Sequence, residues 1–290
     1  MLAQAKINTC AFLRLMFLAR TNILMRTYII LFTCLAATSA VLHAAEQLPV
    51  RPLSTDRPDQ TESAQTVPKG WFQVESNLVS FSRTRQAGQR SDETSFCDFI
   101  FKYGVTHNTD LQIGWAPRLL HRSEDAESVL IGENNGSGDL YLRMKTNLVG
   151  NDEGPYALAL LPWTKAPTAT EGLGNQRWEY GLTVNQELDI GGGWELGSSI
   201  FLSMAVTDHQ TRYFEPAFTI AIGRDLTEKI GFYVETYQGY LTDEGRYWQS
   251  SLDGGLTYLV NPNLKFDVGV NWYYNAQEAI NPFVGVSFRF

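Results

Sequence analysis

Hydrophobic and polar residues alternate along two segments at the end of the chain. In residues 264–272 every second side chain is apolar, and polar or small residues fill the positions between them. Residues 282–290 repeat the pattern and end on an aromatic residue. Because strand side chains point alternately to the two faces of a sheet, each segment is expected to present one face to lipid and one to water. A terminal aromatic strand is typical of outer-membrane barrels, and we expect Phe288 and Phe290 to form the signal that the barrel-assembly machinery recognises.

The same alternation, weaker in places, predicts about twelve strands in all. We expect them at residues 71–82, 95–105, 110–116, 138–148, 156–162, 177–188, 194–206, 213–226, 230–240, 247–259, 264–272 and 282–290. An even number of strands places both ends of a barrel on one side of the membrane, so about ten or about fourteen would also fit.

Every second connection between these strands is short and rich in Asn, Asp, Gly and Pro, the residues that favour turns. These connections are 106–109, 149–155, 189–193, 227–229 and 260–263, whereas 117–137 and 163–176 are long. Short periplasmic turns and longer external loops are characteristic of bacterial barrels. A soluble β-sandwich would also alternate, but Trp and Tyr near many strand ends resemble the aromatic girdles of a membrane barrel. The sequence therefore predicts an all-β, transmembrane, antiparallel up-and-down barrel of the Gram-negative outer membrane.

The first 44 residues have the features of a cleaved secretory signal. Four basic residues and no acid precede an apolar run at residues 28–42, which the small residues Ala44 and Ala45 follow. Met25 offers a second possible start. Cleavage after Ala44 would leave Cys97 as the single cysteine, and we expect its side chain to face lipid. Residues 45–69 are polar and irregular, and the sequence allows either a periplasmic tail or a plug inside the barrel.

The composition of the chain limits the classes of binding partner that we expect. The formal net charge of -8 argues against nucleic acid, which requires a basic surface. The mean hydropathy of -0.19 is compatible with a membrane barrel, because only alternate residues meet lipid. No metal-type Cys/His spacing occurs, and we expect no metal or other cofactor. The expected partners are outer-membrane lipid, the assembly machinery and a small-molecule solute, while the oligomeric state stays open.

The polar faces of the strands supply the candidate functional residues. We expect a solute pathway in the lumen to be lined by Glu75, Asp98, Lys102, Asp139, Tyr141, Arg143, Lys145, Glu179, Glu215, Tyr233, Glu235, Tyr237 and Asp253. Acids outnumber bases on this face, which would repel anions from a narrow channel. Two alternatives stay open: these charges pair and fill the lumen, or they line a continuous pore.

Two other classes of function are alternatives to a passive channel. A structural or adhesive barrel without a pore would make use of the long external loops. A lipid hydrolase would need a base within reach of a nucleophile, and His121 with Ser123 is a candidate pair in the 117–137 connection. Because no established hydrolase motif occurs, we expect no catalytic residues and no enzyme.

Several motifs resemble a known family. Residues 54–63 read STDRPDQTES and lead into VPKGW at 67–71, while YGVT at 103–106 precedes Asp110, and GSGDL stands at 136–140. These motifs resemble the bacterial outer-membrane transporter-like family labelled "MetA-pathway of phenol degradation, putative", from about residue 52 to the end. The resemblance implies a barrel that passes small, conceivably aromatic or hydrophobic, compounds.

Overall fold

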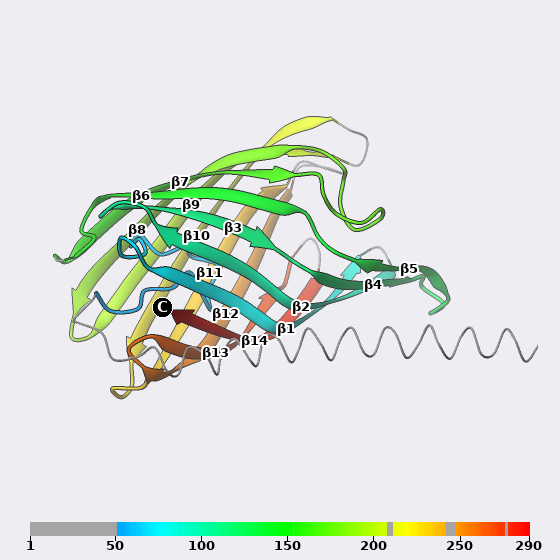
Figure 1. Ribbon diagram of the computed structural model, residues 1–290. Coiled ribbons are helices and arrows are strands. Elements are labelled where there is room, and N and C mark those ends of the chain that lie inside the picture. The colour runs from blue at the N-terminus through cyan, green and yellow to red at the C-terminus, as the bar shows by residue number, and fades with distance from the viewer. Residues whose placement is uncertain (1–50, 87, 153, 208–210, 242–246, 276–277) are drawn as a thin grey trace, which may run out of the picture. The chain divides into compact units, whose positions relative to one another are not determined.

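The computed structural model describes residues 51–290 except 87, 153, 208–210, 242–246 and 276–277. Its strands form one antiparallel sheet that closes on itself, because β1 pairs with both β2 and β14 (Figure 1). The expected signal, residues 1–44, lies outside the described residues. Within the described part, no helix has the length and apolar character needed to span a membrane.

The strand bounds follow the alternation closely. They are β1 Phe72–Gln86, β2 Gln89–Gly104, β3 Thr109–Trp115, β4 Arg118–Glu124, β5 Leu130–Gly136, β6 Leu140–Val149, β7 Tyr156–Ala166, β8 Glu179–Gly191, β9 Trp194–Val206, β10 Arg212–Asp225, β11 Ile230–Leu241, β12 Tyr247–Asn261, β13 Leu264–Tyr273 and β14 Glu278–Arg289.

The closed barrel has 12 strands, as expected. The β3 and β4 strands are successive parts of one wall strand, since both pair with β2. The β5 and β6 strands continue one another in the same way, because β5 pairs with β4 and β6 with β3. The expectation of a long loop at 117–137 was therefore wrong: most of it is the β4–β5 hairpin, which projects beyond the neighbouring strands (Figure 1).

The two ends of the barrel differ. Tight turns after β2, β6, β8, β10 and β12 lie together at one end, here called the turn end. The β1–β2 and β4–β5 hairpins lie at the opposite, hairpin end. The chain closes the barrel at the turn end, where the backbones of Phe72 and Phe290 exchange two hydrogen bonds of 2.9 Å. The role of Phe288 and Phe290 in assembly stays a prediction.

The two faces of the wall have opposite character. Apolar side chains such as Leu111, Leu256 and Val268 point outward and are almost half exposed. Small polar side chains such as Asn185 and Thr219 point inward and are fully buried. Burial of polar groups requires hydrogen-bonding partners. Thr219 accepts a hydrogen bond from Thr61 inside the barrel, and Asn185 accepts one from Ser199 on the neighbouring strand.

One irregularity was not expected. Cys97 has a φ of 53° and is buried, so the expectation that it faces lipid was wrong. The pairing of β1 with β14 shifts between Asn77 and Val79, next to this position. Because a bulge moves the following side chains to the other face, Ser80 and Ser95 hydrogen bond at 3.0 Å on the inside.

The assignment of faces predicts the outcome of two arginine substitutions on β13. Val268 points outward with 48% exposure, whereas Asn271 pairs with the inward-facing Asp253. Val268→Arg is expected to cost about 2–4 kcal/mol, because it places a charge in lipid, and Asn271→Arg far less. Folding titrations into lipid vesicles measure both, and a larger loss for Asn271→Arg would contradict the assignment.

Candidate functional site: a polar segment inside the barrel

Residues 51–69, called the lumen segment below, lie against the inward face of the wall. The backbone N–H of Val67 donates to Asp110 on β3 at 2.8 Å. That of Gln60 donates to Glu235 on β11 at 2.8 Å, and that of Glu62 to Ser199 on β9 at 2.9 Å. The segment therefore crosses the barrel from one wall to the other and satisfies the inward polar groups.

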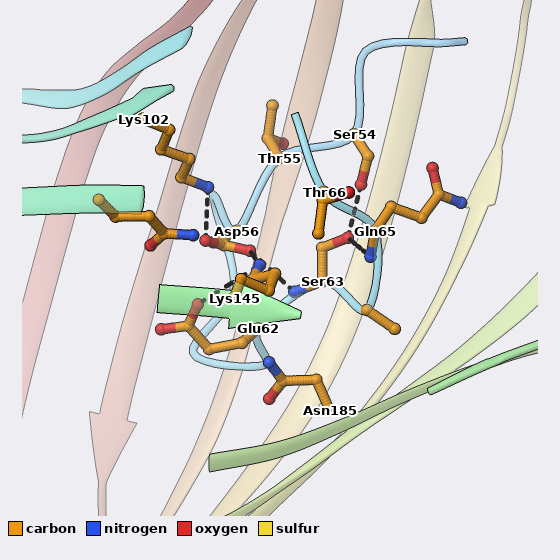
Figure 2. Close-up of polar contacts among 12 residues, drawn as sticks. Ser54, Thr55, Asp56, Glu62, Ser63, Gln65, Thr66, Lys102, Lys145 and Asn185 are labelled. Atoms are coloured by element: carbon orange, nitrogen blue, oxygen red, sulfur yellow. Dashed lines mark hydrogen bonds and ion pairs between the residues drawn. The ribbon is translucent and has the colours of Figure 1, made fainter. Parts of the chain in front are cut away.

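Asp56 is the most strongly held residue of the segment (Figure 2). Its two carboxylate oxygens each accept a 2.5 Å hydrogen bond, one from Lys102 and one from Lys145. Lys102 also pairs with Glu75, which accepts the backbone N–H of Asp56 at 2.9 Å. Burial opposes ionisation of Asp56, but Lys102, Lys145 and Arg143 outweigh it and hold its pKa well below the ordinary value. Asp56 thus lies as a carboxylate between two lysines and anchors the lumen segment to the wall.

Glu62 and Asp59 have the opposite electrostatic character. Burial raises the pKa of Glu62 to about 7 against the opposing effect of Arg143, with which it forms an ion pair. Burial and the nearby Glu235 raise the pKa of Asp59 well above its usual value. Neither carboxyl is stabilised as an anion in the way that Asp56 is.

Arg57 extends from the segment in another direction. Its guanidinium donates to the fully buried carboxylate of Asp267 at 2.6 Å and lies 5.3 Å from the ring centre of Phe283. A Cβ at Gly285 would stand 2.1 Å from Nη2 of Arg57. Glycine at this position of β14 therefore leaves the space that the arginine occupies.

Cavities lie on both sides of the segment. One of about 580 Å³ is bounded by inward residues of β1, β2, β6 and β7, including Asp98, Tyr141 and Lys165. The other, of about 320 Å³, reaches the turn end beside Glu195 and Asp225. We call them the hairpin-side and turn-side cavities. Arg57 lines both, so its side chain stands between them.

The lumen segment brings together most of the predicted lining residues. Glu75, Lys102, Arg143 and Lys145 surround Asp56 and Glu62. On the opposite wall, Glu235 and Asp253 accept hydrogen bonds from Gln60, and the Tyr233 hydroxyl donates to the Pro58 carbonyl at 3.4 Å.

The remaining predicted lining residues contact parts of the chain other than the lumen segment. Asp139 accepts the backbone N–H groups of Thr168 and Ala169, and Glu179 accepts that of Val206, so these acids hold connections at the hairpin end. Further contacts join Tyr213 to Glu215, Asn77 to Asp98, Tyr141 to Trp163 and Tyr237 to Tyr273.

The sequence pattern missed several residues of the site. Asp56, Arg57 and Glu62 lie in a segment without periodicity, although its density of charges was the available signal. Lys165 was missed because it follows the nearly continuous apolar run at 156–162, where alternation cannot separate the two faces. It pairs with Glu179 at 2.8 Å.

The candidate hydrolase pair is not assembled. His121 Nε2 lies 3.4 Å from the hydroxyl of Ser91 rather than that of Ser123, and its Nδ1 lies 3.9 Å from Glu93. Among the described residues, no cluster of three or more His, Cys, Asp and Glu is arranged to hold a metal ion.

A family model described as "Putative MetA-pathway of phenol degradation" matches residues 55–290. The chain belongs to this family. The match begins inside the lumen segment, so that segment is part of what the family shares with this chain. No protein with curated functional information matches the sequence.

The barrel is similar to solved outer-membrane structures. An outer membrane channel from Pseudomonas putida F1 is 13% identical, with a TM-score of 0.58 over 78% of this chain and 98% of that chain. The NanC porin is 11% identical, with a TM-score of 0.48 over 74% of this chain and 98% of that chain. The first likeness confirms that the fold is that of an outer-membrane β-barrel.

Proposed function

We propose that this protein is a passive outer-membrane channel for small solutes, with the lumen segment as its constriction. The observation that supports the proposal best is the position of Arg57 between two cavities inside one closed barrel. The turn end faces the periplasm, as in bacterial barrels with short periplasmic turns. The signal at residues 1–44 delivers the chain across the inner membrane and is cleaved after Ala44.

The hairpin-side cavity is suited to small organic compounds. Tyr141 supplies aromatic surface, and Asp98 has a buried carboxylate oxygen without a partner among the described residues. An unsatisfied buried acceptor favours a ligand that can donate a hydrogen bond. Together these groups support small aromatic or hydrophobic solutes that carry a hydroxyl or amino group.

The absence of a pore would favour a structural barrel instead. Conductance of the refolded protein in planar bilayers separates the two functions. Discrete single-channel steps support the channel, and an insulating bilayer with correctly folded protein would contradict it.

The channel is expected to prefer cations. Glu93 and Asp98 line the hairpin-side cavity without an ion pair to Lys or Arg among the described residues, whereas Lys165 there is paired with Glu179. A low-dielectric wall focuses such charge into the pore. Glu93→Gln combined with Asp98→Asn is expected to lower the reversal potential in a salt gradient, and more at low than at high salt, because salt screens charges.

Glu228→Gln at the turn end is the control for each of the two substitutions made singly, since it removes one negative charge from the exposed turn between β10 and β11. Preference for anions in the unmodified channel would refute the charge argument.

A further inference from the structure

Arginine side chains gather on the outward face just beyond the apolar part of the wall. The outward residues of β1 run from Phe72 through Val79 and Phe81 to Arg83 and Arg85. At a rise of about 3.3 Å per residue and a tilt of about 40°, Phe72 and Phe81 lie about 23 Å apart along the membrane normal. An apolar band is about 25 Å tall, so the two arginines stand at headgroup level.

The neighbouring strands continue this charged row with ion pairs. Asp92 on β2 binds Arg83 at 2.8 Å and Arg90 at 3.7 Å. Glu124 on β4 binds both Arg90 and Arg122 at 2.8 Å. Three arginines thus share two carboxylates on the outward face of a chain whose net charge is -8.

A groove of about 360 Å³ lies beside this row. Its lining is Arg83, Arg85, Trp272, Glu278, Ala279 and Ile280. Trp272 and Ile280 supply an apolar floor and are 52% and 45% exposed.

The two arginines of the groove have guanidinium N–H groups that make no hydrogen bond with the described residues. Arg85 has no ion pair with any described residue, although Glu278 is its partner in the β1–β14 register. Arg83 uses Nε and Nη2 for Asp92, and its Nη1 makes no hydrogen bond with the described part of the chain. The groove therefore combines the guanidinium donors of β1 with apolar surface from β13 and β14.

We propose that this groove binds a phosphate group of the glycolipid that forms the outer leaflet of Gram-negative outer membranes. The guanidinium groups of Arg83 and Arg85 hold the phosphate, because their planar forks match its oxygens. An acyl chain of the same molecule packs on Trp272 and Ile280. The site rests on the hairpin end facing the cell exterior and is independent of whether the barrel conducts.

Lipid A retention by the purified full-length barrel tests the site. Native mass spectrometry is used to titrate the detergent-solubilised protein with lipid A. Arg83→Gln with Arg85→Gln is expected to weaken binding about tenfold or more, since a charge-assisted pair with phosphate is lost. Arg224→Gln is the matched control, because Arg224 stands beside an aromatic ring, Trp194, at the opposite end of the barrel.

Titrations with different ligands distinguish a lipid phosphate from a free phosphate ion. Lipid A without its phosphates is expected to bind weakly to the unmodified protein. Its affinity should equal that of intact lipid A for the double variant. Competition by inorganic phosphate at equal concentration would overturn the lipid assignment in favour of a free-anion site. Equal binding by the double variant, or an equal loss in Arg224→Gln, would overturn the site itself. If the double variant does not fold, the single variant Arg85→Gln decides, because Arg85 forms no ion pair with the described part of the chain.

Discussion

Replacing Asp56 with asparagine is expected to destabilise the folded lumen segment by about 3–5 kcal/mol, the cost of breaking a buried ion pair from one side. The substitution leaves Lys102 and Lys145 inside the barrel with fewer compensating charges. Their side chains are 3% and 0% exposed, so water cannot replace the lost carboxylate without opening the segment.

Hydrogen exchange of residues 54–66 and urea unfolding in detergent measure this loss. Asp59→Asn is the matched control, because burial already favours the neutral form of that carboxyl by raising its pKa. We expect little loss of protection there. Equal protection in Asp56→Asn and the unmodified protein would show that the lysines do not anchor the segment.

The carboxylate of Asp56 also makes the stability of the lumen segment depend on pH. The pKa of Asp56 is lowered in the folded state, so its contribution is fully present above its unfolded pKa of about 4 and is lost as the pH falls through the folded value. Protection of the segment is therefore expected to fall in strong acid in the unmodified protein. In Asp56→Asn this acid-dependent step is expected to be absent, and an unchanged step would assign it to another group.

Replacing Arg57 with alanine is expected to have a second large effect. The substitution leaves the fully buried carboxylate of Asp267 without its 2.6 Å partner, which again costs about 3–5 kcal/mol. It also removes the side chain that stands between the two cavities. We therefore expect both a lower midpoint in urea and a higher single-channel conductance.

Arg51→Ala provides the comparison for Arg57→Ala. Arg51 belongs to the same segment but pairs at 3.4 Å with Asp152, whose side chain is 43% exposed. Because the carboxylate of this pair is partly exposed, its loss costs less than the loss of the buried pair of Arg57, so a smaller change is expected in both measurements. Equal effects of the two substitutions would mean that the cavities are not separated by Arg57.

The sequence contained most of the information about the wall. Alternation placed Val268 outward and Glu235 inward because a strand pattern reports directly on which face is buried. It failed at Cys97, where a residue with positive φ accompanies a shift in register that alternation cannot reveal. It also failed at 117–137, because the β4–β5 hairpin stands beyond the apolar band and has no strict alternation to preserve.

The site was less accessible from the sequence than the wall. Lys102 and Lys145 could be assigned to the lumen from their strands, but their common partner Asp56 lies in an aperiodic segment. Only the folded chain shows that these three residues meet. The long separation of Arg57 and Asp267 along the chain has the same consequence.

The single-channel conductance of the refolded protein with and without residues 45–69 tests the account most directly. If the lumen segment is the constriction, the shortened barrel conducts several-fold more current than the full-length protein. Equal conductance of the two proteins would contradict this role of the segment, provided that both are folded, as judged by different migration of unboiled and boiled samples in detergent gels.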